Sequence, residues 1–455
     1  MRYVSTRGGS VPVSFRDAVT LGQANDGGLL MPNEIPNVAE RNDSWQKLGF
    51  ADLAIEIAGL YAPDIPRDQM SQLINDAFSS FSSPDVVPLR ELNDCFVLEL
   101  FHGPTLAFKD IALQVLGRLF ELTLEEDDSY LNILGATSGD TGSAAIAGVK
   151  DRKRLNIFVM FPEGRTSLLQ ELQMTTVQCS NAHCIGIRGS FDDCQRIMKA
   201  IFDDVEFKTR YRLGAVNSIN WARLMVQIVY YYFASLRFDE PVSFSVPTGN
   251  FGNILSGMIA KRMGAPIETF ILGTNENDVL FNFFCTGVYE RGQVHPTLSP
   301  SMDIQVASNL ERYVYLQLRG DSVALNRFMD CFAETGRAEL EGQHAHVEKV
   351  TARRIDTREC LQTISQVWQD SGYVLDPHSA VGVAAARSVG LTSPTVCLAT
   401  AHPGKFPDAI ARATGSSPPT HPFLLELDQA NARKVVLPPN EANVRDYIVK
   451  ELKTA

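Results

Sequence analysis

From about residue 93 onward, short apolar runs alternate with segments of helical periodicity, and this alternation constrains the fold more than any other feature of the chain. Strands are expected at 96–100, 130–134, 156–161, 183–187, 242–246, 267–272 and 395–399. Strands that alternate with helices form parallel sheets whose faces the helices cover. The sequence therefore predicts an α/β fold, in which ligands bind where the carboxyl ends of strands meet the N-termini of helices.

Residues 1–92 do not show this alternation. They are rich in turns and in short amphipathic helices, and the Ser82-Ser83-Pro84-Asp85 stretch interrupts the chain. We expect an N-terminal domain over residues 1–92 and a catalytic body of two α/β subdomains over residues 93–455, with a mostly helical region near 276–345. With 455 residues and 45% hydrophobic composition, the chain is large enough for two or three cores.

The net charge and the cysteine pattern restrict the partners. A net charge of −12 argues against a nucleic-acid-binding protein. No run is long and apolar enough to span a bilayer, and the N-terminus lacks an apolar signal core, so we expect a cytoplasmic protein without a membrane partner. The expected assembly is a monomer or a homodimer. The eight cysteines include no CxxC pair, and we expect reduced thiols and no metal. The segment from Cys179 to Cys184 runs directly into an apolar stretch, which favours burial over metal binding.

One lysine stands out by its position in the chain. The segment from Phe101 to Asp110 breaks at Gly103-Pro104, and helical spacing of apolar residues begins beside Lys109. The helix dipole and partial desolvation favour a neutral amine there, and a neutral amine can form a Schiff base. Lys109 is therefore the candidate catalytic residue, and an ordinary surface lysine is the alternative. His102 either orients groups near Lys109 or packs.

Two polar loops share a pattern of strand, small polar residues and helix. One runs from Gly135 to Ser143, and the other from Val246 to Ile254. Such loops offer unpaired backbone amides and a helix dipole to an anion, and their glycines allow a ligand to approach the backbone closely. Both loops are therefore candidate anion sites.

Several motifs, in the order in which they occur along the chain, resemble those of the threonine synthase family. The members of this family are pyridoxal-phosphate enzymes of fold type II. These motifs are the Lys109 segment, Ser138-Gly139-Asp140-Thr141, Gly249-Asn250-Phe251-Gly252-Asn253 and Thr400-Ala401-His402-Pro403-Gly404-Lys405-Phe406. The opening segments Tyr3-Val4-Ser5-Thr6-Arg7-Gly8 and Asp26-Gly27-Gly28-Leu29 are also similar to that family. The resemblance covers nearly the whole chain, and it implies parallel sheets flanked by helices together with an N-terminal domain.

The resemblance implies a role for each cofactor-binding residue. Lys109 would hold pyridoxal phosphate through its amine, and the backbone amides of Gly249, Asn250, Phe251, Gly252 and Asn253 would hold the phosphate. Thr400 would contact the pyridine nitrogen with its hydroxyl. A hydroxyl does not keep that nitrogen protonated, so the cofactor would withdraw electrons more mildly.

The resemblance also implies two sets of substrate-binding residues. Thr137, Ser138, Asp140 and Thr141 would hold the α-carboxylate, and Asn217, Ser218 and Arg223 would bind the substrate's phosphate. Asp140 stands where related enzymes often place an asparagine that faces the ring hydroxyl; a carboxylate there could instead be solvated or protonated. Taken alone, Arg223 would more often form a surface ion pair.

The implied activity is that of a lyase of threonine biosynthesis. Such an enzyme converts O-phospho-L-homoserine and water to L-threonine and phosphate by γ-elimination and β-addition of water. One alternative is a serine or threonine dehydratase-like enzyme of the same fold type, which needs no second anion site. The other is a catalytically silent cofactor-binding homologue.

Overall fold

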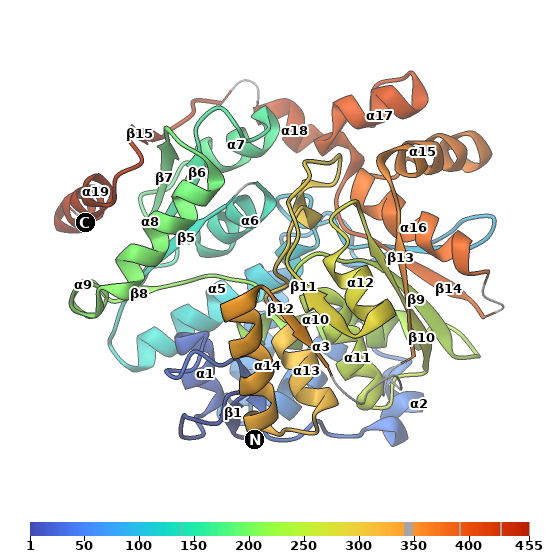
Figure 1. Ribbon diagram of the computed structural model, residues 1–455, viewed down its shortest axis with the longest axis horizontal. Coiled ribbons are helices and arrows are strands. Elements are labelled where there is room, and N and C mark those ends of the chain that lie inside the picture. Colours follow the sequence, from blue (N-terminus) through green and yellow to red (C-terminus); the bar gives the residue numbers. More distant parts are fainter. Residues whose placement is uncertain (138, 341–348, 391–392, 428–429, 455) are drawn as a thin grey trace. The chain divides into compact units, whose positions relative to one another are not determined.

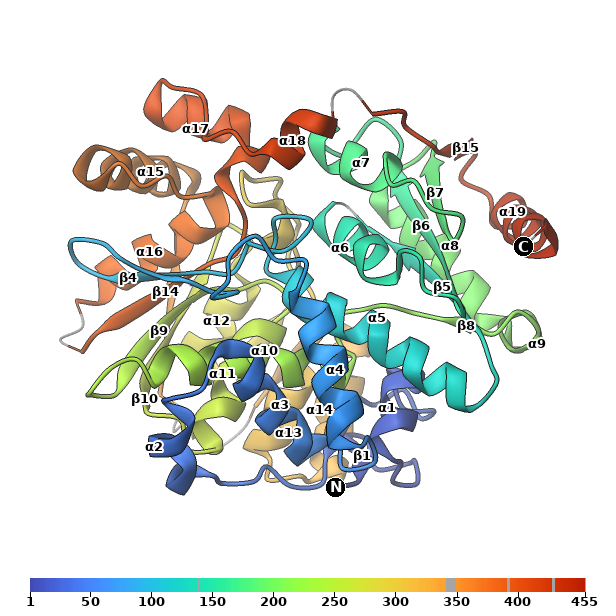
Figure 2. The same ribbon diagram turned by 180° about the vertical axis from the view of Figure 1, so that it is seen from behind.

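The chain folds as two compact units, and the computed structural model describes residues 1–137, 139–340, 349–390, 393–427 and 430–454 (Figures 1 and 2). Unit 1 comprises Met1–Ala18, Gln23–Ala112 and Ser218–Pro419. Unit 2 comprises Val19–Gly22, Leu113–Asn217 and Thr420–Ala455. Helices α1 (Phe15–Leu21) and α5 (Lys109–Glu126) each contribute residues to both units.

Unit 1 is built on a six-stranded sheet. Its order is β13 (Val350–Arg354), β10 (Ile267–Thr274), β9 (Val242–Pro247), β14 (Thr395–Ala399), β4 (Phe96–Glu99) and β3 (Leu89–Glu91). The first five strands are parallel, and β3 joins the edge antiparallel to β4. The carboxyl ends of β9, β14 and β4 therefore lie side by side at one edge of the sheet, where the predicted ligand site belongs.

Helices cover both faces of this sheet, as the alternation of side chains along the strands requires. Phe244 and Phe270 face α10 (Trp221–Ser235) and α11 (Gly252–Arg262) and contact Tyr231. Ile271 points the other way, into a core shared with α16 (Pro377–Val389). Helices α15 (Thr357–Ser371) and α17 (Pro407–Thr414) and the 3-10 turn η3 (Pro403–Lys405) complete that side.

The N-terminal segment of unit 1 packs on α10, on the side of the sheet that carries Phe244 and Phe270. It consists of the β1–β2 pair (Tyr3–Ser5, Leu30–Pro32), η1 (Ala39–Arg41), α2 (Asn42–Trp45), α3 (Phe50–Tyr61) and α4 (Arg67–Phe78). Tyr61 of α3 meets Trp221 of α10 edge to face, with ring centroids 5.5 Å apart. The expected domain boundary at residue 92 stays a prediction.

Unit 2 contains a second, fully parallel sheet. Its order is β15 (Val435–Leu437), β7 (Ala182–Ile187), β6 (Leu155–Pro162), β5 (Leu131–Ala136) and β8 (Leu213–Gly214). Its helices are α6 (Asp140–Val149), α7 (Leu168–Thr175), α8 (Phe191–Asp203), α9 (Val205–Arg210), α18 (Pro422–Leu427) and α19 (Glu441–Thr454). Val444 and Ile448 of α19 are buried in the same core as Phe158. The two parallel sheets confirm the predicted α/β class.

The region from 276 to 340 contains helices and a small sheet. The helices are α12 (Val279–Thr286), η2 (Pro300–Met302), α13 (Leu310–Gln317) and α14 (Ser322–Thr335). The sheet pairs β11 (Val288–Glu290) with β12 (Arg337–Glu339) in antiparallel fashion, and the periodicity of the sequence did not indicate it. Residues 341–345 of the predicted helical region lie outside the described residues. Across the described ranges, no helix combines the length and apolar character that a membrane span requires.

Candidate active site

Lys109 begins α5 at the end of a tightly bonded turn. Thr105 donates hydrogen bonds from its N–H (2.8 Å) and its Oγ1 (2.7 Å) to the carboxylate of Asp110. Burial raises the pKa of Asp110 to about 6, although these bonds and the charge of Lys405 act in the opposite direction. Leu106 is buried and has a φ of 60°, a conformation that is uncommon for a bulky residue and concentrates at functional sites. The turn therefore fixes the point from which the lysine projects.

The side chain of Lys109 is nearly enclosed, with 8% of its surface exposed. Its Nζ lies 3.4 Å from the hydroxyl of Ser301 and 5.3 Å from the ring centre of Phe108. The backbone N–H of Phe108 donates to the carbonyl of Thr400 at 2.9 Å. The structure thus brings Lys109 next to the end of β14, as parallel neighbouring strands require.

The loop after β9 presents a row of backbone donors. No N–H from Gly249 to Asn253 donates a hydrogen bond to another described residue. The first turn of a helix leaves its N–H groups without intrahelical partners, and α11 begins at Gly252. Phe251, the residue before α11, has a φ of 66° and supplies no side-chain cap. These amides and the helix dipole make this loop an anion cradle.

Asn253 adds a side-chain donor at the same helix start. Its Oδ1 accepts hydrogen bonds from the hydroxyls of Tyr230 (2.5 Å) and Tyr231 (2.8 Å). Its Nδ2 is buried and meets no acceptor in the described part of the chain. A buried amide without a partner costs free energy, so this group is suited to a ligand oxygen.

Arg223 lies in the first turn of α10, behind the N-cap residue Asn220. It is 3% exposed, and within the described ranges its buried Nε and Nη1 have no hydrogen-bond partner. Burial lowers the pKa of Arg223 to about 10, and interaction with Tyr230 opposes this shift slightly, so the guanidinium stays charged at neutral pH. The surface ion pair weighed from the sequence is therefore wrong. A buried, unpaired guanidinium is a ready site for an anion.

Asn309 and Arg312 join loops of unit 1, and no pattern in the sequence indicated a role for either residue. Asn309 donates its backbone N–H to the carbonyl of Asn250 (3.1 Å) and its Nδ2 to that of Ser218 (3.1 Å). Arg312 is fully buried and donates to Oδ1 of Asn309 (2.6 Å). Arg312 also donates to the carbonyls of Leu30 (2.9 Å) and Ile219 (2.5 Å). We call this set of bonds the Arg312 clamp; it ties the anion cradle to the loop that precedes Arg223.

The predicted carboxylate loop belongs to unit 2. Thr137 Oγ1 accepts from the N–H groups of Gly139 and Gly142, both at 3.0 Å, and Thr141 is half-buried. Asp140 is buried and accepts from Nε2 of Gln170 at 3.0 Å, so the solvated alternative for Asp140 is wrong.

Three of the predicted substrate-binding residues remain to be located in the structure. Ser138 lies outside the described residues. Asn217 ends the middle segment of unit 2, and Ser218, which begins the last segment of unit 1, shares a hydrogen bond of 2.6 Å with Ser308. Lys109, the anion cradle, Thr400 and Arg223 all lie in unit 1.

Other features do not form a second site. His102 pairs with the buried Glu99 at 2.8 Å, which favours the packing interpretation for it. Cys179 and Cys184 are buried, and no group of three metal-binding side chains occurs within the described ranges.

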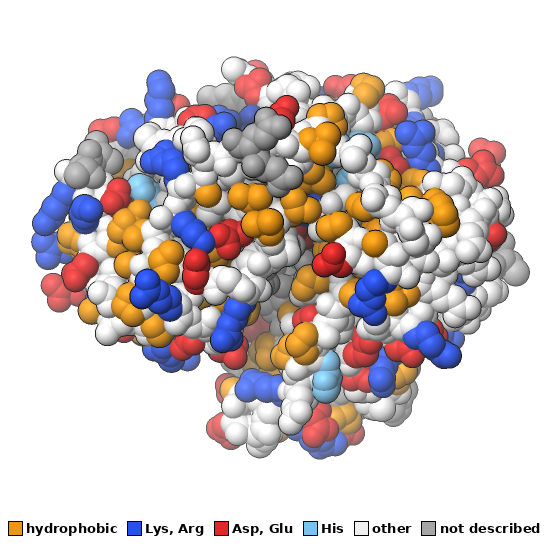
Figure 3. All heavy atoms as spheres, turned by 90° about the horizontal axis from the view of Figure 1, so that it is seen from above, with side chains coloured by type: hydrophobic (Ala, Val, Ile, Leu, Met, Phe, Trp, Pro, Cys, Tyr) orange, Lys and Arg blue, Asp and Glu red, His pale blue; other side chains and the backbone are white. Residues whose placement is uncertain are grey.

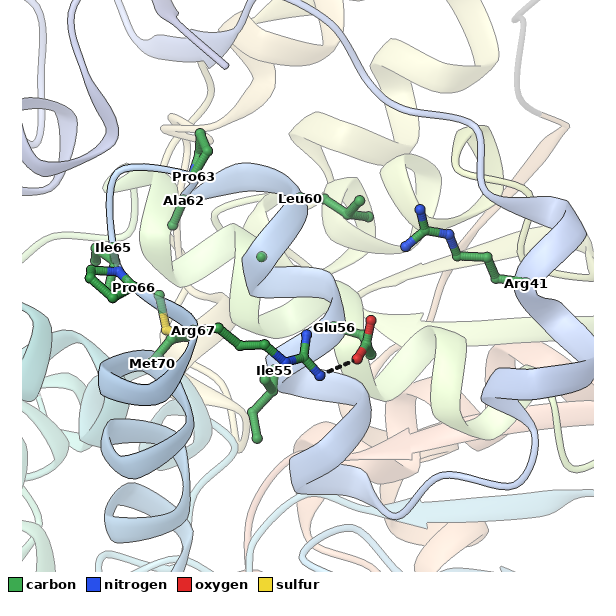
Figure 4. A pocket seen from close by; sticks show the side chains of 11 residues that line it. Arg41, Ile55, Glu56, Leu60, Ala62, Pro63, Ile65, Pro66, Arg67 and Met70 are labelled. Atoms are coloured by element: carbon green, nitrogen blue, oxygen red, sulfur yellow. Dashed lines mark hydrogen bonds and ion pairs between the residues drawn. The ribbon is translucent and has the colours of Figure 1, made fainter.

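A hollow of about 410 Å³ is lined by residues 41–70, with the Glu56–Arg67 ion pair on its wall (Figure 4). It includes none of the predicted site residues. On the face shown in Figure 3, acidic and basic side chains are interspersed.

Comparisons with known proteins show the family of the chain. Family models match over residues 2–78 (threonine synthase N terminus), 85–341 (pyridoxal-phosphate dependent enzyme) and 379–448 (threonine synthase, C-terminal). Threonine synthase of Schizosaccharomyces pombe is 44% identical over 91% of this chain and 89% of its own. The Pseudomonas aeruginosa enzyme is 43% identical over 98% of both chains.

A solved structure matches as well. The crystal structure of pyridoxal-phosphate-bound threonine synthase from Brucella melitensis superposes with a TM-score of 0.96, at 42% identity over 99% of both chains. The chain therefore belongs to the threonine synthase family of pyridoxal-phosphate dependent enzymes.

Proposed function

We propose that this chain converts O-phospho-L-homoserine and water to L-threonine and inorganic phosphate. The observation that carries the proposal is Arg223, a buried guanidinium whose two buried nitrogens meet no acceptor in the described part of the chain. An enzyme that acts on unphosphorylated serine or threonine needs only one phosphate site, for the cofactor. The guanidinium of Arg223 provides a second candidate anion site in addition to the anion cradle, and this supports a substrate that carries its own phosphate.

The residues of unit 1 fit pyridoxal phosphate. Lys109 would bind its carbonyl carbon, the free N–H groups from Gly249 to Asn253 would hold its phosphate, and Thr400 would face its ring nitrogen. When bound, the cofactor withdraws electrons from the carbon next to the amino group of the substrate. The loop of Thr137, Ser138, Asp140 and Thr141 is proposed to hold the substrate's α-carboxylate.

Lys109 is proposed to carry the proton transfers. Its amine removes the α-proton of the amino acid, and a second proton then leaves Cβ. The C–O bond at Cγ breaks and releases phosphate. Water adds its oxygen to Cβ, and protons return to Cγ and Cα. One C–O bond breaks, at Cγ, and one forms, at Cβ. Threonine and phosphate together contain the same atoms as the substrate and water.

A product assay tests this proposal. The purified protein is incubated with pyridoxal phosphate and O-phospho-L-homoserine, and threonine and phosphate are quantified together. Equal amounts of both support the proposal, and L-homoserine serves as the unphosphorylated control that should yield no threonine. Phosphate with a keto acid would indicate elimination without water addition. If neither threonine nor phosphate is formed, the result favours the dehydratase-like or the silent alternative.

Gly249 gives a sharp prediction for the anion cradle. A Cβ atom at residue 249 would lie 2.7 Å from the carbonyl oxygen of Ser301, closer than real Cβ contacts allow. Gly249→Ala must therefore displace the loop or the neighbouring turn, and we expect pyridoxal phosphate affinity of the cofactor-free protein to fall at least about tenfold. Absorbance or fluorescence titration with the cofactor measures it.

Gly59 provides the matched control for that substitution. Nothing lies within 4 Å of a Cβ at this position in the last turn of α3. Gly59→Ala should leave cofactor affinity unchanged and stabilise the protein by up to about 0.5–1 kcal/mol, because alanine favours helical backbone more than glycine does. Equal cofactor affinity in both variants would contradict the cradle assignment.

The cytoplasm is the proposed location. All eight cysteines are free thiols, and this suits a reducing compartment. A monomer or homodimer remains the predicted assembly, and light scattering of the purified protein measures it.

A further inference from the structure

The carboxylate of Asp376 lies at the origin of two hydrogen-bonded chains that both lead to Lys109. We propose that Asp376, together with His378 and Ser379, positions the lysine amine and the end of β14 relative to each other. These are positioning residues, since they act through Ser301 and Thr400. The inference rests on the proposed function only in taking Lys109 as the residue that carries the chemistry.

Asp376 begins α16 as its N-cap residue, with Pro377 in the first helical position. Its Oδ1 accepts the backbone N–H of His378 at 2.9 Å, and its Oδ2 accepts that of Ser379 at 3.4 Å. This much is ordinary helix capping. The carboxylate is 1% exposed and also receives the side chains of both residues. Four donors and the helix dipole together offset the burial of its charge.

The first chain passes through His378 to the turn beside the lysine. The backbone N–H of Ser301 donates to Nε2 of His378 at 3.2 Å. Because an N–H can only donate, Nε2 must accept, and the proton of the neutral ring lies on Nδ1. Nδ1 then donates to Asp376 at 2.9 Å. The hydroxyl of Ser301, in turn, lies 3.4 Å from Nζ of Lys109.

The second chain passes through Ser379 to the end of β14. The backbone N–H of Thr400 donates to Oγ of Ser379 at 3.0 Å, and that hydroxyl donates to Asp376. The carbonyl of Thr400 accepts from the N–H of Phe108, the residue before Lys109. The first chain therefore ends at the amine of Lys109 and the second at the backbone of the preceding residue, so that both reach the segment that carries the lysine.

The turn that carries Ser301 is held on its other side as well. Asp303 accepts from the side chains of Thr297 (2.7 Å), Asn275 (2.8 Å) and Asn277 (3.0 Å). With Asp303 anchored there, the backbone bond to His378 determines where the Ser301 hydroxyl lies. The same turn contacts Gly249, so its position affects both the amine and the anion cradle.

A neighbouring helix shows what capping alone requires. Asp356 is the N-cap of α15 and accepts the N–H of Glu359 at 2.7 Å. Unlike Asp376, Asp356 accepts no side-chain hydrogen bond from any described residue. Capping in this unit therefore does not need a histidine and a serine that reach into two other loops. Asp356→Asn is the control for altered capping, since it weakens a helix cap that has no link to Ser301 or Thr400.

His378→Phe is the principal test, because it keeps the ring that packs against Phe406 and removes both nitrogens. In the cofactor-free protein we expect the amide of Ser301 to exchange deuterium about five- to tenfold faster. In the loaded enzyme we expect kcat to fall about 10- to 100-fold, with KM for O-phospho-L-homoserine changed less than about threefold. The visible absorption band of the bound cofactor should shift. His378→Gln, which keeps an acceptor for Ser301, should restore part of each property.

The outcomes separate this inference from the proposed function. Unchanged exchange at Ser301 in His378→Phe would overturn the inference, as would equal losses of kcat in His378→Phe and Asp356→Asn. If His378→Phe does not fold, Ser379→Ala provides the exchange measurement on the second chain: the amide of Thr400 should exchange faster, and unchanged exchange there would overturn the inference. A wild-type protein that makes no threonine would instead overturn the proposed function, while the exchange result would still stand.

Discussion

Replacing Lys109 with alanine is expected to lower threonine formation on the order of 10⁴-fold or more, because the amine both binds the cofactor and transfers the protons. No other lysine takes its place at this edge of the sheet among the described contacts: Lys405 is buried, but it donates to the carbonyl of Thr105 at 3.0 Å. Steady-state assay of threonine, together with the visible spectrum of the bound cofactor, measures the effect.

Two variants control for side effects of that substitution. Lys109→Arg keeps the positive charge but has no amine that can condense with a carbonyl, so it should be as inactive as the alanine variant. Lys261→Ala removes a lysine at the end of α11 that donates to the carbonyl of Glu268, and it should retain wild-type activity. Substantial threonine formation by Lys109→Ala would remove Lys109 from the mechanism.

Replacing Arg223 with methionine is expected to stabilise the protein and to impair the reaction. Removal of an unpaired buried charge should raise the free energy of unfolding by about 1–4 kcal/mol, since methionine fills a similar volume without a desolvation cost. The same change removes the proposed partner of the substrate's phosphate, so kcat/KM should fall about 10²- to 10³-fold. Chemical denaturation of the cofactor-free protein and steady-state kinetics give the two numbers.

The paired result makes the Arg223 prediction specific. Arg354 forms an ion pair with Asp278 at 3.2 Å on the surface, so Arg354→Met should change stability and kinetics little. A structural role for Arg223 would lower both stability and activity in Arg223→Met. Unchanged kinetics with O-phospho-L-homoserine would instead favour the dehydratase-like alternative.

The sequence predicted those parts of the site that are continuous in the chain. Lys109, the run from Gly249 to Asn253, and Thr400 each follow a short apolar strand, and the periodicity that identifies a strand also locates its carboxyl end. Parallel pairing then places these ends on one edge. The local pattern was therefore sufficient for the fold class and for the positions of the lysine and the anion cradle.

The sequence did not predict the contacts that join distant segments. His378 meets Ser301 across 77 positions, and Arg312 meets Leu30 across 282. Ser301 lies in a stretch without periodicity, and Asp376 has the appearance of an ordinary helix cap in the sequence. Strand β15 reaches the sheet of unit 2 from the far end of the chain in the same way. Such pairings depend on packing of the whole unit, and propensity does not encode them.

The Arg312 clamp has a consequence for how sequences of this kind can diverge. At Leu30, Ser218, Ile219 and Asn250 it uses main-chain carbonyls, which every amino acid possesses. Substitution at these four positions leaves the bonded atoms in place. An insertion or deletion nearby moves a carbonyl away from a fully buried guanidinium, and that charge would then lack compensation. These loops can therefore drift in composition while their lengths stay fixed.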